Sequence, residues 1–249
     1  MRKLEGKVAL VTGAGSGIGA ATAVRFAQDG ARVVCCDVNV DNAENVVAEI
    51  KGAGGEAIAV KVDVSQKDQV DAAVAAAVEA FGGLDCVVNN AGITRDKSAK
   101  KLSEDAWDAV LNVNLKGTFL VCQAAMNQML AQGRGGRISN TASVAIDGNF
   151  GQANYAASKA GVVGLTRTLA LECAKAGITV NVVAPGATDT AMFNGVPDEI
   201  KAMIVKSIPL RRMAEPHEVA AVHSFLCSDD ASYVTGQLLY VDGGATLGV

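Results

Sequence analysis

Thr12-Gly13-Ala14-Gly15-Ser16-Gly17-Ile18-Gly19 directly follows the apolar run Val8–Thr12 and opens a segment with helical periodicity, Ile18–Asp29. Glycine permits positive φ angles and close approach of the backbone, and the N-terminus of a helix offers free N–H groups to a pyrophosphate. A glycine-rich pattern alone is weak evidence, because ordinary turns also use glycine. Between a strand and a helix, it favours a dinucleotide-binding loop over a plain turn.

Short β-branched runs alternate with longer helical segments along the whole chain. The runs are nearly continuously apolar, which is typical of strands covered on both faces of a parallel sheet. The predicted strands are Val8–Thr12, Arg32–Asp37, Ala57–Asp63, Cys86–Asn89, Arg137–Ala142, Thr179–Ala184 and Leu238–Val241. The predicted helices are Ile18–Asp29, Val40–Lys51, Gln66–Phe81, Glu104–Asn112, Leu115–Gln132, Tyr155–Lys175 and Pro216–Leu226. This alternation predicts an α/β fold, a single-domain Rossmann fold with a doubly wound seven-stranded parallel sheet and helices on both faces.

Local signals predict several element ends. Ser65 and Asp68 resemble a capping box at the start of an Ala-rich helix, and Gly82-Gly83 would end that helix. Ser103 is a second candidate N-cap. The longest irregular stretch, about 185–209, is predicted to be a substrate-binding loop or lid.

The composition describes an acidic chain with a large apolar fraction. Half of the residues are apolar, 19% are charged, and the net charge is −4. This balance argues against nucleic-acid binding, and no apolar run reaches the roughly 20 residues that a membrane-spanning helix needs. The start of the chain shows no signal-peptide pattern, and the six cysteines have no C-x-x-C spacing. We therefore expect a soluble, cytoplasmic protein with buried, reduced thiols. The scarcity of histidine argues against a histidine zinc site or a Ser-His-Asp triad, and no metal is expected.

Asp37 ends the second predicted strand, where an acidic side chain accepts hydrogen bonds from the adenosine ribose hydroxyls. The same carboxylate would repel a 2′-phosphate, and Ser16 and Val38 stand where a phosphate site would have Arg or Lys. The sequence therefore predicts NAD(H) in preference to NADP(H). The alternative, that Asp37 merely caps a strand, is less favoured because Asp37 accompanies the glycine loop.

Two further strand ends carry candidate cofactor contacts, because open α/β sheets bind ligands at the carboxyl ends of their strands. Asp63 and Val64 are expected near the adenine. In Asn89-Asn90-Ala91-Gly92, Asn90 is expected to line the ribose, with Ala91 and Gly92 in the same cofactor site. Asn89 is expected to tie neighbouring strands together.

Four side chains form the candidate catalytic set. Tyr155 and Lys159 lie on one face of a helix, and a nearby ammonium lowers the pKa of a phenol from about 10 toward the neutral range. Ser143, just after the fifth strand, can donate to a substrate carbonyl oxygen. Asn114 is expected either to hold a water for proton relay or only to mark a capped break between helices.

These residues resemble the short-chain dehydrogenase/reductase family over essentially the whole chain. The matching stretches are TGAGSGIG at 12–19, NNAG at 89–92, Asn114, Ser143, YAASK at 155–159 and PGATDT at 185–190. The resemblance implies that Tyr155 is the acid/base, that Ser143 polarises the carbonyl, and that Lys159 also binds the nicotinamide ribose. Asn114 would complete the relay.

The resemblance carries further expectations about the cofactor loop and the assembly. It places Pro185, Gly186, Thr188 and Thr190 in a loop beside the nicotinamide. It also implies a homotetramer, in which the C-terminal segment 236–249 would join an interface. The apolar surface of the two long central helices fits subunit contact.

Within the family, NNAGITRD, GQANYAASK, GITVNVVAP and GQLLYVDGG resemble 3-oxoacyl-acyl-carrier-protein reductases. That resemblance implies a 3-oxoacyl thioester substrate and raises an acyl carrier protein as a partner. Arg134 and Arg137 are candidates to meet such an acidic carrier, or they are ordinary solvated charges. Those reductases usually favour NADPH, whereas Asp37 predicts NAD. Dehydrogenases of sugars, polyols, steroids or other secondary alcohols therefore stay open as alternatives.

The substrate pocket is expected between Thr94–Lys97, Val144–Phe150 and Ala191–Val205. Its candidate contacts are Asp147, Asn149, Phe150, Met192 and Phe193. Two other functions are disfavoured. A nucleotide-sugar epimerase or dehydratase usually has a longer C-terminal domain, and a non-catalytic dinucleotide sensor would be expected to lack Tyr155, Lys159 or Ser143.

Overall fold

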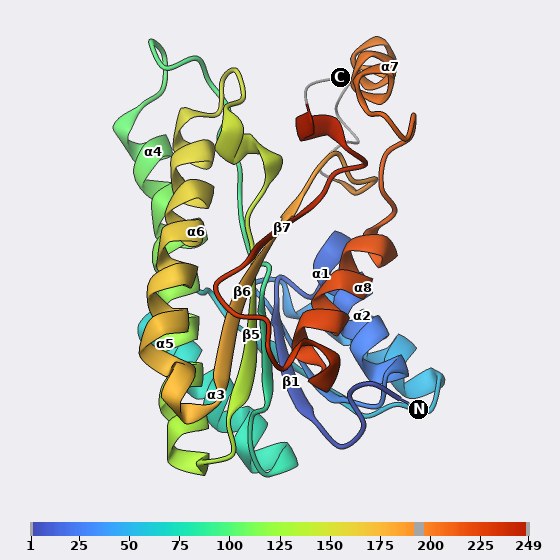
Figure 1. Ribbon diagram of the computed structural model, residues 1–249, viewed down its shortest axis with the longest axis vertical. Coiled ribbons are helices and arrows are strands. Elements are labelled where there is room, and N and C mark those ends of the chain that lie inside the picture. The colour runs from blue at the N-terminus through green and yellow to red at the C-terminus, as the bar shows by residue number, and fades with distance from the viewer. Residues whose placement is uncertain (1, 192–196, 248–249) are drawn as a thin grey trace.

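One parallel sheet forms the centre of the molecule (Figure 1). The computed structural model of the protein describes residues 2–191 and 197–247. The sheet has seven strands in the order β3-β2-β1-β4-β5-β6-β7. The strands are β1 (Val8–Thr12), β2 (Arg32–Asp37), β3 (Ala57–Lys61), β4 (Cys86–Asn89), β5 (Gly136–Thr141), β6 (Ile178–Pro185) and β7 (Leu238–Val241). The predicted doubly wound Rossmann fold is confirmed.

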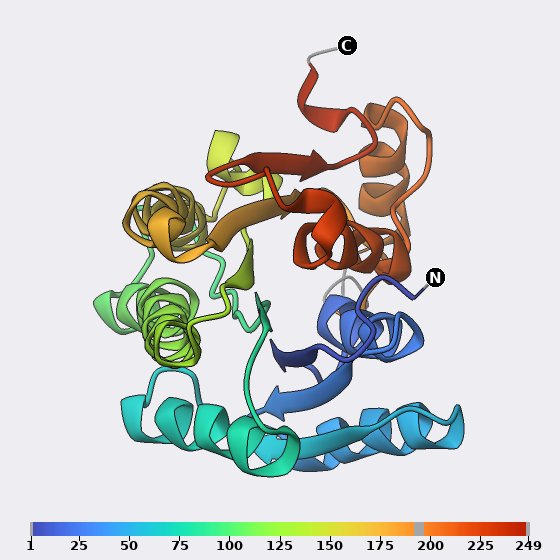
Figure 2. The ribbon, with the colours of Figure 1, turned by 60° about the horizontal axis from the view of Figure 1, so that its bottom comes forward.

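Helices cover both faces of the sheet (Figure 2). The helices are α1 (Gly17–Gln28), α2 (Val40–Gly52), α3 (Lys67–Phe81), α4 (Glu104–Leu111), α5 (Thr118–Gln132), α6 (Ala153–Cys173), α7 (Asp198–Ser207) and α8 (Pro216–Cys227). α1, α2 and α8 share one apolar cluster with the sheet, and α3, α5 and α6 share another. Figure 2 shows α1 and α8 on one side of the strands and α5 and α6 on the other.

β1 shows why the strands are so apolar. All five of its residues are buried. Val8 and Leu10 pack into the cluster on one face, and Ala9 and Val11 pack into the cluster on the other. A strand covered on both faces by helices has no solvent side on which a polar residue would be favoured.

The structure tests three predicted helix ends. Ser103 caps α4, accepting the Ala106 N–H, and Gly82 ends α3 with a left-handed φ of 83°, so both predictions are confirmed. The capping box of Ser65 and Asp68 is wrong. The Ser65 backbone N–H and hydroxyl both donate to the Asp63 carboxylate, and α3 begins after Gln66 without a side-chain cap.

Two further features modify the predicted elements. Residues 112–117 form a π-helical turn, η1 (Asn112–Gly117), so that α4 and α5 continue through a widened turn. The stretch predicted as irregular, about 185–209, contains the ten-residue α7. Its start after Pro197 with Asp198 and Glu199 in the first turn is a helix signal that the sequence carried.

The six cysteines, Cys35, Cys36, Cys86, Cys122, Cys173 and Cys227, are all free and buried, as predicted. Burial raises the pKa of the Cys35 thiol to about 12, and it also raises that of Cys122 to about 12. Such thiols stay protonated at neutral pH. Among the described residues, no helix is both long and apolar enough to cross a membrane.

Candidate active site

A cleft of about 940 Å³ opens at the carboxyl ends of the strands. It gathers most of the predicted site residues from segments far apart in the sequence. Those that line it are Gly13, Ser16, Gly17, Ile18, Asp37, Asp63, Val64, Asn90, Ala91, Gly92, Ser143, Tyr155, Lys159, Pro185, Gly186, Thr188 and Thr190. Gly15, Gly19 and Asn114 do not line the cleft. Each of them contacts a residue that does, namely Asp37, Gly13 and Ile93 respectively.

The glycine loop between β1 and α1 packs too tightly to hold side chains. Gly13 has a φ of +63°, and a Cβ there would lie 2.9 Å from the Cα of Ala91. A Cβ on Gly19 would overlap the carbonyl oxygen of Gly13. Because α1 begins at Gly17, its first N–H groups have no partner within the helix, and they belong to residues that line the cleft. This backbone cradle fits a pyrophosphate.

Asp37, at the end of β2, fixes the second side of this cradle. Its carboxylate accepts the Gly15 N–H at 2.8 Å and the Asn39 N–H at 2.9 Å. Each of its oxygens thus accepts one backbone hydrogen bond and retains a lone pair, while the side chain also lines the cleft. Asp37 therefore holds the glycine loop in place and presents acceptors to the cleft. Its hydrogen bonds with a ribose stay a prediction.

Two asparagines at the end of β4 have different contacts, and Asn89 ties neighbouring strands together as predicted. Asn89 is buried and donates from Nδ2 to Oδ1 of Asn140 on β5 at 2.8 Å. Asn90 donates from Nδ2 to the Gly13 carbonyl oxygen at 3.3 Å, and its backbone N–H donates to Thr12 Oγ1 at 3.1 Å. Asn90 thereby ties the glycine loop to the end of β4 while it lines the cleft.

Asn114 lies in the π-helical turn η1 and is fully buried. Its Oδ1 accepts the Ile93 N–H at 2.8 Å, and its Nδ2 donates to the Ile93 carbonyl and to Ser158 Oγ, both at 3.1 Å. The predicted helix irregularity is confirmed. Both Nδ2 hydrogens are engaged by protein groups, so the side chain clamps the β4–α4 connection against α6. The water relay stays a prediction.

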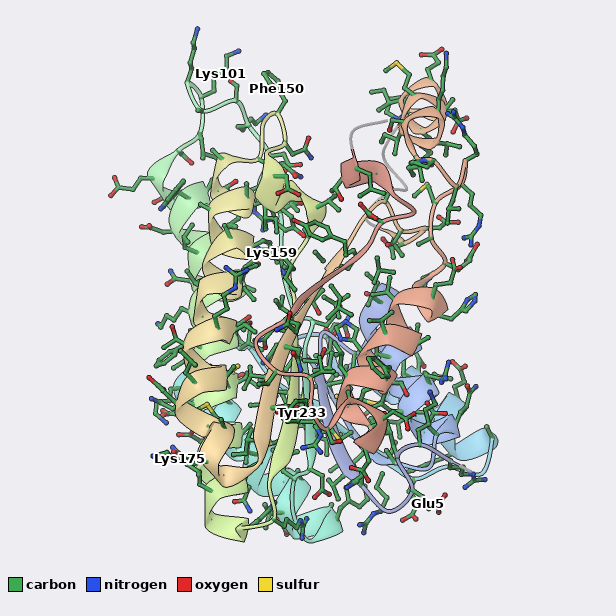
Figure 3. All side chains as sticks on the ribbon, viewed as in Figure 1. Glu5, Lys101, Phe150, Lys159, Lys175 and Tyr233 are labelled. Atoms are coloured by element: carbon green, nitrogen blue, oxygen red, sulfur yellow. The ribbon has the colours of Figure 1, made fainter. Side chains whose placement is uncertain are left out.

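Tyr155 and Lys159 belong to the first half of α6, and both line the cleft. Figure 3 labels Lys159. The Lys159 Nζ lies 5.7 Å from the centre of the Tyr155 ring and donates to the Thr141 carbonyl oxygen at 2.7 Å. Lys159 is almost completely buried, and burial lowers its pKa to about 8. The ammonium form still predominates at neutral pH.

The phenol of Tyr155 has a different balance from the one predicted. Burial raises its pKa, the hydrogen bond with Ser143 lowers it, and the charge of Asp96 raises it. The expected lowering by the Lys159 ammonium is not seen, and burial outweighs the Ser143 contact. Ser143 Oγ also accepts the Ala145 N–H at 3.2 Å, which helps to orient its hydroxyl.

A buried histidine on α8 supports β5, the strand whose Thr141 carbonyl oxygen accepts the hydrogen bond from Lys159. His223 is fully buried, with Nδ1 2.7 Å from Ser139 Oγ and Nε2 3.4 Å from Thr141 Oγ1. Burial lowers the pKa of His223 to about 3, so the ring is neutral at physiological pH. The Thr141 carbonyl as the Lys159 acceptor was not predicted. It is a backbone group, and no residue type in the sequence marks it.

The substrate side of the cleft corrects several predictions. Asn149 lines the cleft, but Asp147 does not, because its carboxylate accepts the Tyr240 hydroxyl at 3.0 Å. Phe150 is 94% exposed and projects at the tip of its loop, away from Lys159 (Figure 3). Met192 and Phe193 lie outside the described residues.

Arg134 and Arg137 lie at the opposite edge of the sheet, at and just before the amino end of β5. Arg134 donates to the Asp85 carboxylate at 2.9 Å. Arg137 donates to the carbonyl oxygens of Gly136 and Gly177. The cleft opens at the carboxyl end of the sheet, so both arginines lie away from it. Their contact with a carrier protein stays a prediction, beside the alternative of ordinary solvated charges.

The fold, the glycine cradle and the Ser-Tyr-Lys group define a Rossmann-fold oxidoreductase. The chain belongs to the short-chain dehydrogenase/reductase family, and the family model described as enoyl-(acyl carrier protein) reductase matches residues 13–246.

Relatives cover nearly the whole chain. The chain is 46% identical to the 3-oxoacyl-[acyl-carrier-protein] reductase FabG of Thermotoga maritima over 98% of this chain and 100% of that protein. It is 44% identical to the (2S)-[(R)-hydroxy(phenyl)methyl]succinyl-CoA dehydrogenase subunit BbsD of Thauera aromatica over 98% of each. A short-chain type dehydrogenase/reductase from Mycobacterium marinum superposes with a TM-score of 0.95 at 36% identity, covering 98% of this chain and 97% of that one.

Proposed function

We propose that the protein interconverts 3-oxoacyl and 3-hydroxyacyl thioesters with NAD(H). The observation that carries this proposal is the placement of Ser143, Tyr155 and Lys159 in one cleft with the glycine cradle. The similarity to FabG and to a CoA-thioester dehydrogenase supports a thioester substrate. Asp37, with its carboxylate in the cleft, supports NAD(H) over NADP(H).

In this mechanism the residues of the chain orient the carbonyl and move one proton. A bound nicotinamide supplies hydride in reduction and takes it back in oxidation. Ser143 donates a hydrogen bond to the substrate oxygen, and the Tyr155 hydroxyl gives that oxygen its proton. Lys159 holds the nicotinamide ribose hydroxyls and supplies the positive charge beside the phenol. Gly13 to Gly19 and Asn90 hold the pyrophosphate and ribose.

The environment of Tyr155 favours the protonated phenol. Burial raises the pKa of Tyr155, so the phenol carries the proton that reduction consumes. Oxidation needs the phenolate, which a rise in pH supplies. We also propose that the protein acts in the cytoplasm, where buried free thiols are stable.

The segment from 185 to 209 is proposed as the substrate loop. Its α7 residues Ile204 and Ser207, with Ile208 after them, line the same cleft as Ser143. Asp37 also supports a second candidate function, the NAD-dependent oxidation of a sugar, polyol, steroid or other secondary alcohol.

A substrate panel tests the proposal. Absorbance at about 340 nm would follow NADH and NADPH separately with acetoacetyl-CoA, an acetoacetyl carrier protein, keto sugars and cyclic ketones. Thioester-dependent oxidation of NADH is the expected result. Turnover of sugars or cyclic ketones alone would replace the thioester with the second function, and a preference for NADPH would remove the role of Asp37.

We also propose a homotetramer. Leu171 of α6 is 82% exposed, and Leu130 and Phe119 of α5 are partly exposed on the same outer layer. Leu247 near the C-terminus is 80% exposed. Light scattering should give about four times the 25.3 kDa chain mass, and a monomer mass would reject the assembly.

A further inference from the structure

A cationic segment borders the mouth of the cleft. The mouth segment, residues 94–102, connects β4 to α4 and contains Arg95, Lys97, Lys100 and Lys101, all of them exposed. Thr94, at its start, lines the cleft. Figure 3 shows Lys101 beside Phe150, at the end of the molecule beyond Lys159.

The backbone fixes this segment next to the start of α6. The Lys97 N–H donates to the Gly151 carbonyl oxygen at 2.9 Å, and Lys97 pairs with Gln152 in a short parallel bridge. Gln152 itself lines the cleft. Tyr155 follows Gln152 by three residues and lies in the first turn of α6. The positive charges thus stand at the entrance to the site of chemistry.

The mouth segment is positive on an acidic chain. Four cations and one anion give it a charge of +3, whereas the whole chain carries −4. The anion, Asp96, accepts a hydrogen bond from Gln152 Nε2 at 2.8 Å. The ion pairs within residues 2–191 and 197–247 include none with Lys97, Lys100 or Lys101.

Outside the mouth segment, the nearest acidic residues in the sequence belong to α4. Glu104 and Asp105 occupy its first turn, where the N-terminal dipole of a helix stabilises negative charge. The N-terminus of α4 therefore stabilises these two carboxylates. The ion pairs of the described residues include none between them and a lysine of the mouth segment.

We propose that the mouth segment binds the phosphate groups of a pantetheine-type thioester, which rests on the proposed function. A 3-oxoacyl thioester that enters the cleft carries its reacting carbonyl at one end of the arm and phosphate at the other. With the carbonyl at Ser143 and Tyr155, the arm leaves between Thr94 and Gln152. Flexible ammonium groups at that exit attract phosphate and steer it from solution. The exposed ring of Phe150 offers an apolar surface for the arm itself.

Two sources share this chemistry, coenzyme A and the phosphopantetheine arm of a carrier protein. A triple variant, Lys97→Ser, Lys100→Ser and Lys101→Ser, separates phosphate binding from catalysis. The matched control replaces three exposed lysines that lie away from the cleft-lining residues, Lys3→Ser, Lys51→Ser and Lys175→Ser. The substrates are acetoacetyl-CoA, an acetoacetyl carrier protein and the acetoacetyl thioester of N-acetylcysteamine, which has no phosphate.

The triple variant should raise the KM for acetoacetyl-CoA roughly tenfold at low ionic strength, with little change in kcat. The difference should shrink at high salt, because salt screens exposed charges. The KM for the N-acetylcysteamine thioester should stay as in the wild type, and the control triple variant should behave as the wild type with all three substrates. A parallel rise with the carrier protein identifies a site shared by both sources, and a rise with acetoacetyl-CoA alone identifies coenzyme A.

Two results would overturn the phosphate site. One is an equal KM change for the phosphate-free thioester, and the other is a change with the carrier protein but none with acetoacetyl-CoA. Titration calorimetry with free coenzyme A tests the site without turnover. If no thioester is reduced, the proposed function fails. The phosphate site then stands only if coenzyme A binds the wild type and binds the triple variant more weakly.

Discussion

The two walls of the cleft are built from different materials. The cofactor wall is mostly backbone, and Gly13, Asp37 and Asn90 lock the glycine loop to the ends of β2 and β4. The substrate wall consists of short segments that present exposed side chains, among them Asn149 and the lysines of the mouth segment. A backbone wall recognises one fixed ligand, whereas a side-chain wall can change with its substrate. Fold and cofactor site therefore define the reaction class, and substrate choice depends on the other wall.

The largest effect is expected where the two walls meet, at Tyr155. Tyr155→Phe removes the proton donor and should lower kcat by roughly a hundredfold to ten-thousandfold. NADH binding, followed by fluorescence, should remain close to wild type because the aromatic ring is kept. Tyr233→Phe, at a fully exposed tyrosine, is the control. Substantial turnover by Tyr155→Phe would remove the phenol from the mechanism.

The buried His223, which supports β5 beside Lys159, can be tested through the folding stability of the protein at low pH. The folded-state pKa of His223 is about 3, below its ordinary value of 6.5. As the pH falls below about 6.5 the unfolded chain takes up a proton that the folded chain refuses, so folding stability is lost progressively down to about pH 3. Between about pH 7.5 and 5 this residue should cost about 2 kcal/mol.

His223→Leu should remove that part of the acid destabilisation, even if its stability at neutral pH is lower. Denaturant unfolding at the two pH values measures the difference. His217→Gln, at an exposed histidine of the same helix, is the control and should retain the full loss. An unchanged loss in His223→Leu would show that the ring does not resist protonation.

Asp37 tests whether the cofactor wall also selects the nucleotide. Asp37→Ala removes the acceptors for the ribose hydroxyls and the repulsion of a 2′-phosphate. The Kd for NADH should rise about tenfold, or about 1.4 kcal/mol, and the preference over NADPH should narrow. Asp41→Ala, on the neighbouring α2, is the control and should leave the Kd values for NADH and NADPH unchanged. An identical NADH to NADPH ratio in Asp37→Ala would leave Asp37 with only its structural role at Gly15.

The smallest effect is expected on the substrate wall. Tyr240 on β7 donates to the Asp147 carboxylate, which belongs to the short 3-10 helix Val144–Asp147 after Ser143. Tyr240→Phe should loosen this wall and raise the KM for the carbonyl substrate roughly two- to tenfold. The KM for NADH should hardly move. A larger change for NADH than for the carbonyl substrate would show that the two walls are not independent.

The sequence predicted the backbone wall well and the side-chain wall poorly. Strand periodicity and the glycine loop are local patterns, so the sheet and the cofactor cleft could be placed in advance. The orientations of Asp147 and Phe150 depend on Tyr240, which lies far away in the sequence, and on a loop between Gly148 and Gly151 with positive φ angles. No local pattern reports such contacts.

Charge and pKa predictions failed for a similar reason. Tyr155 and Lys159 share a helix face as the spacing indicates, but the degree of burial, which raises the pKa of the phenol, is a property of the assembled core. The ion pair of Arg134 with Asp85 was likewise not predicted, because it joins distant parts of the chain. In contrast, the α7 helix was missed although its acidic first turn was legible in the sequence.

The burial of every cysteine gives the molecule an internal gauge of its own opening. A protonated thiol shielded from solvent reacts with a disulfide reagent only while its segment is exposed. Cys35 and Cys36 lie in β2 and Cys86 in β4, whereas Cys122 lies in α5, Cys173 at the end of α6 and Cys227 at the end of α8. Labelling followed by mass spectrometry would therefore rank these regions by how often each one opens, without any added probe. A loss of modification when NADH is present would locate the parts of the fold that the cofactor holds shut.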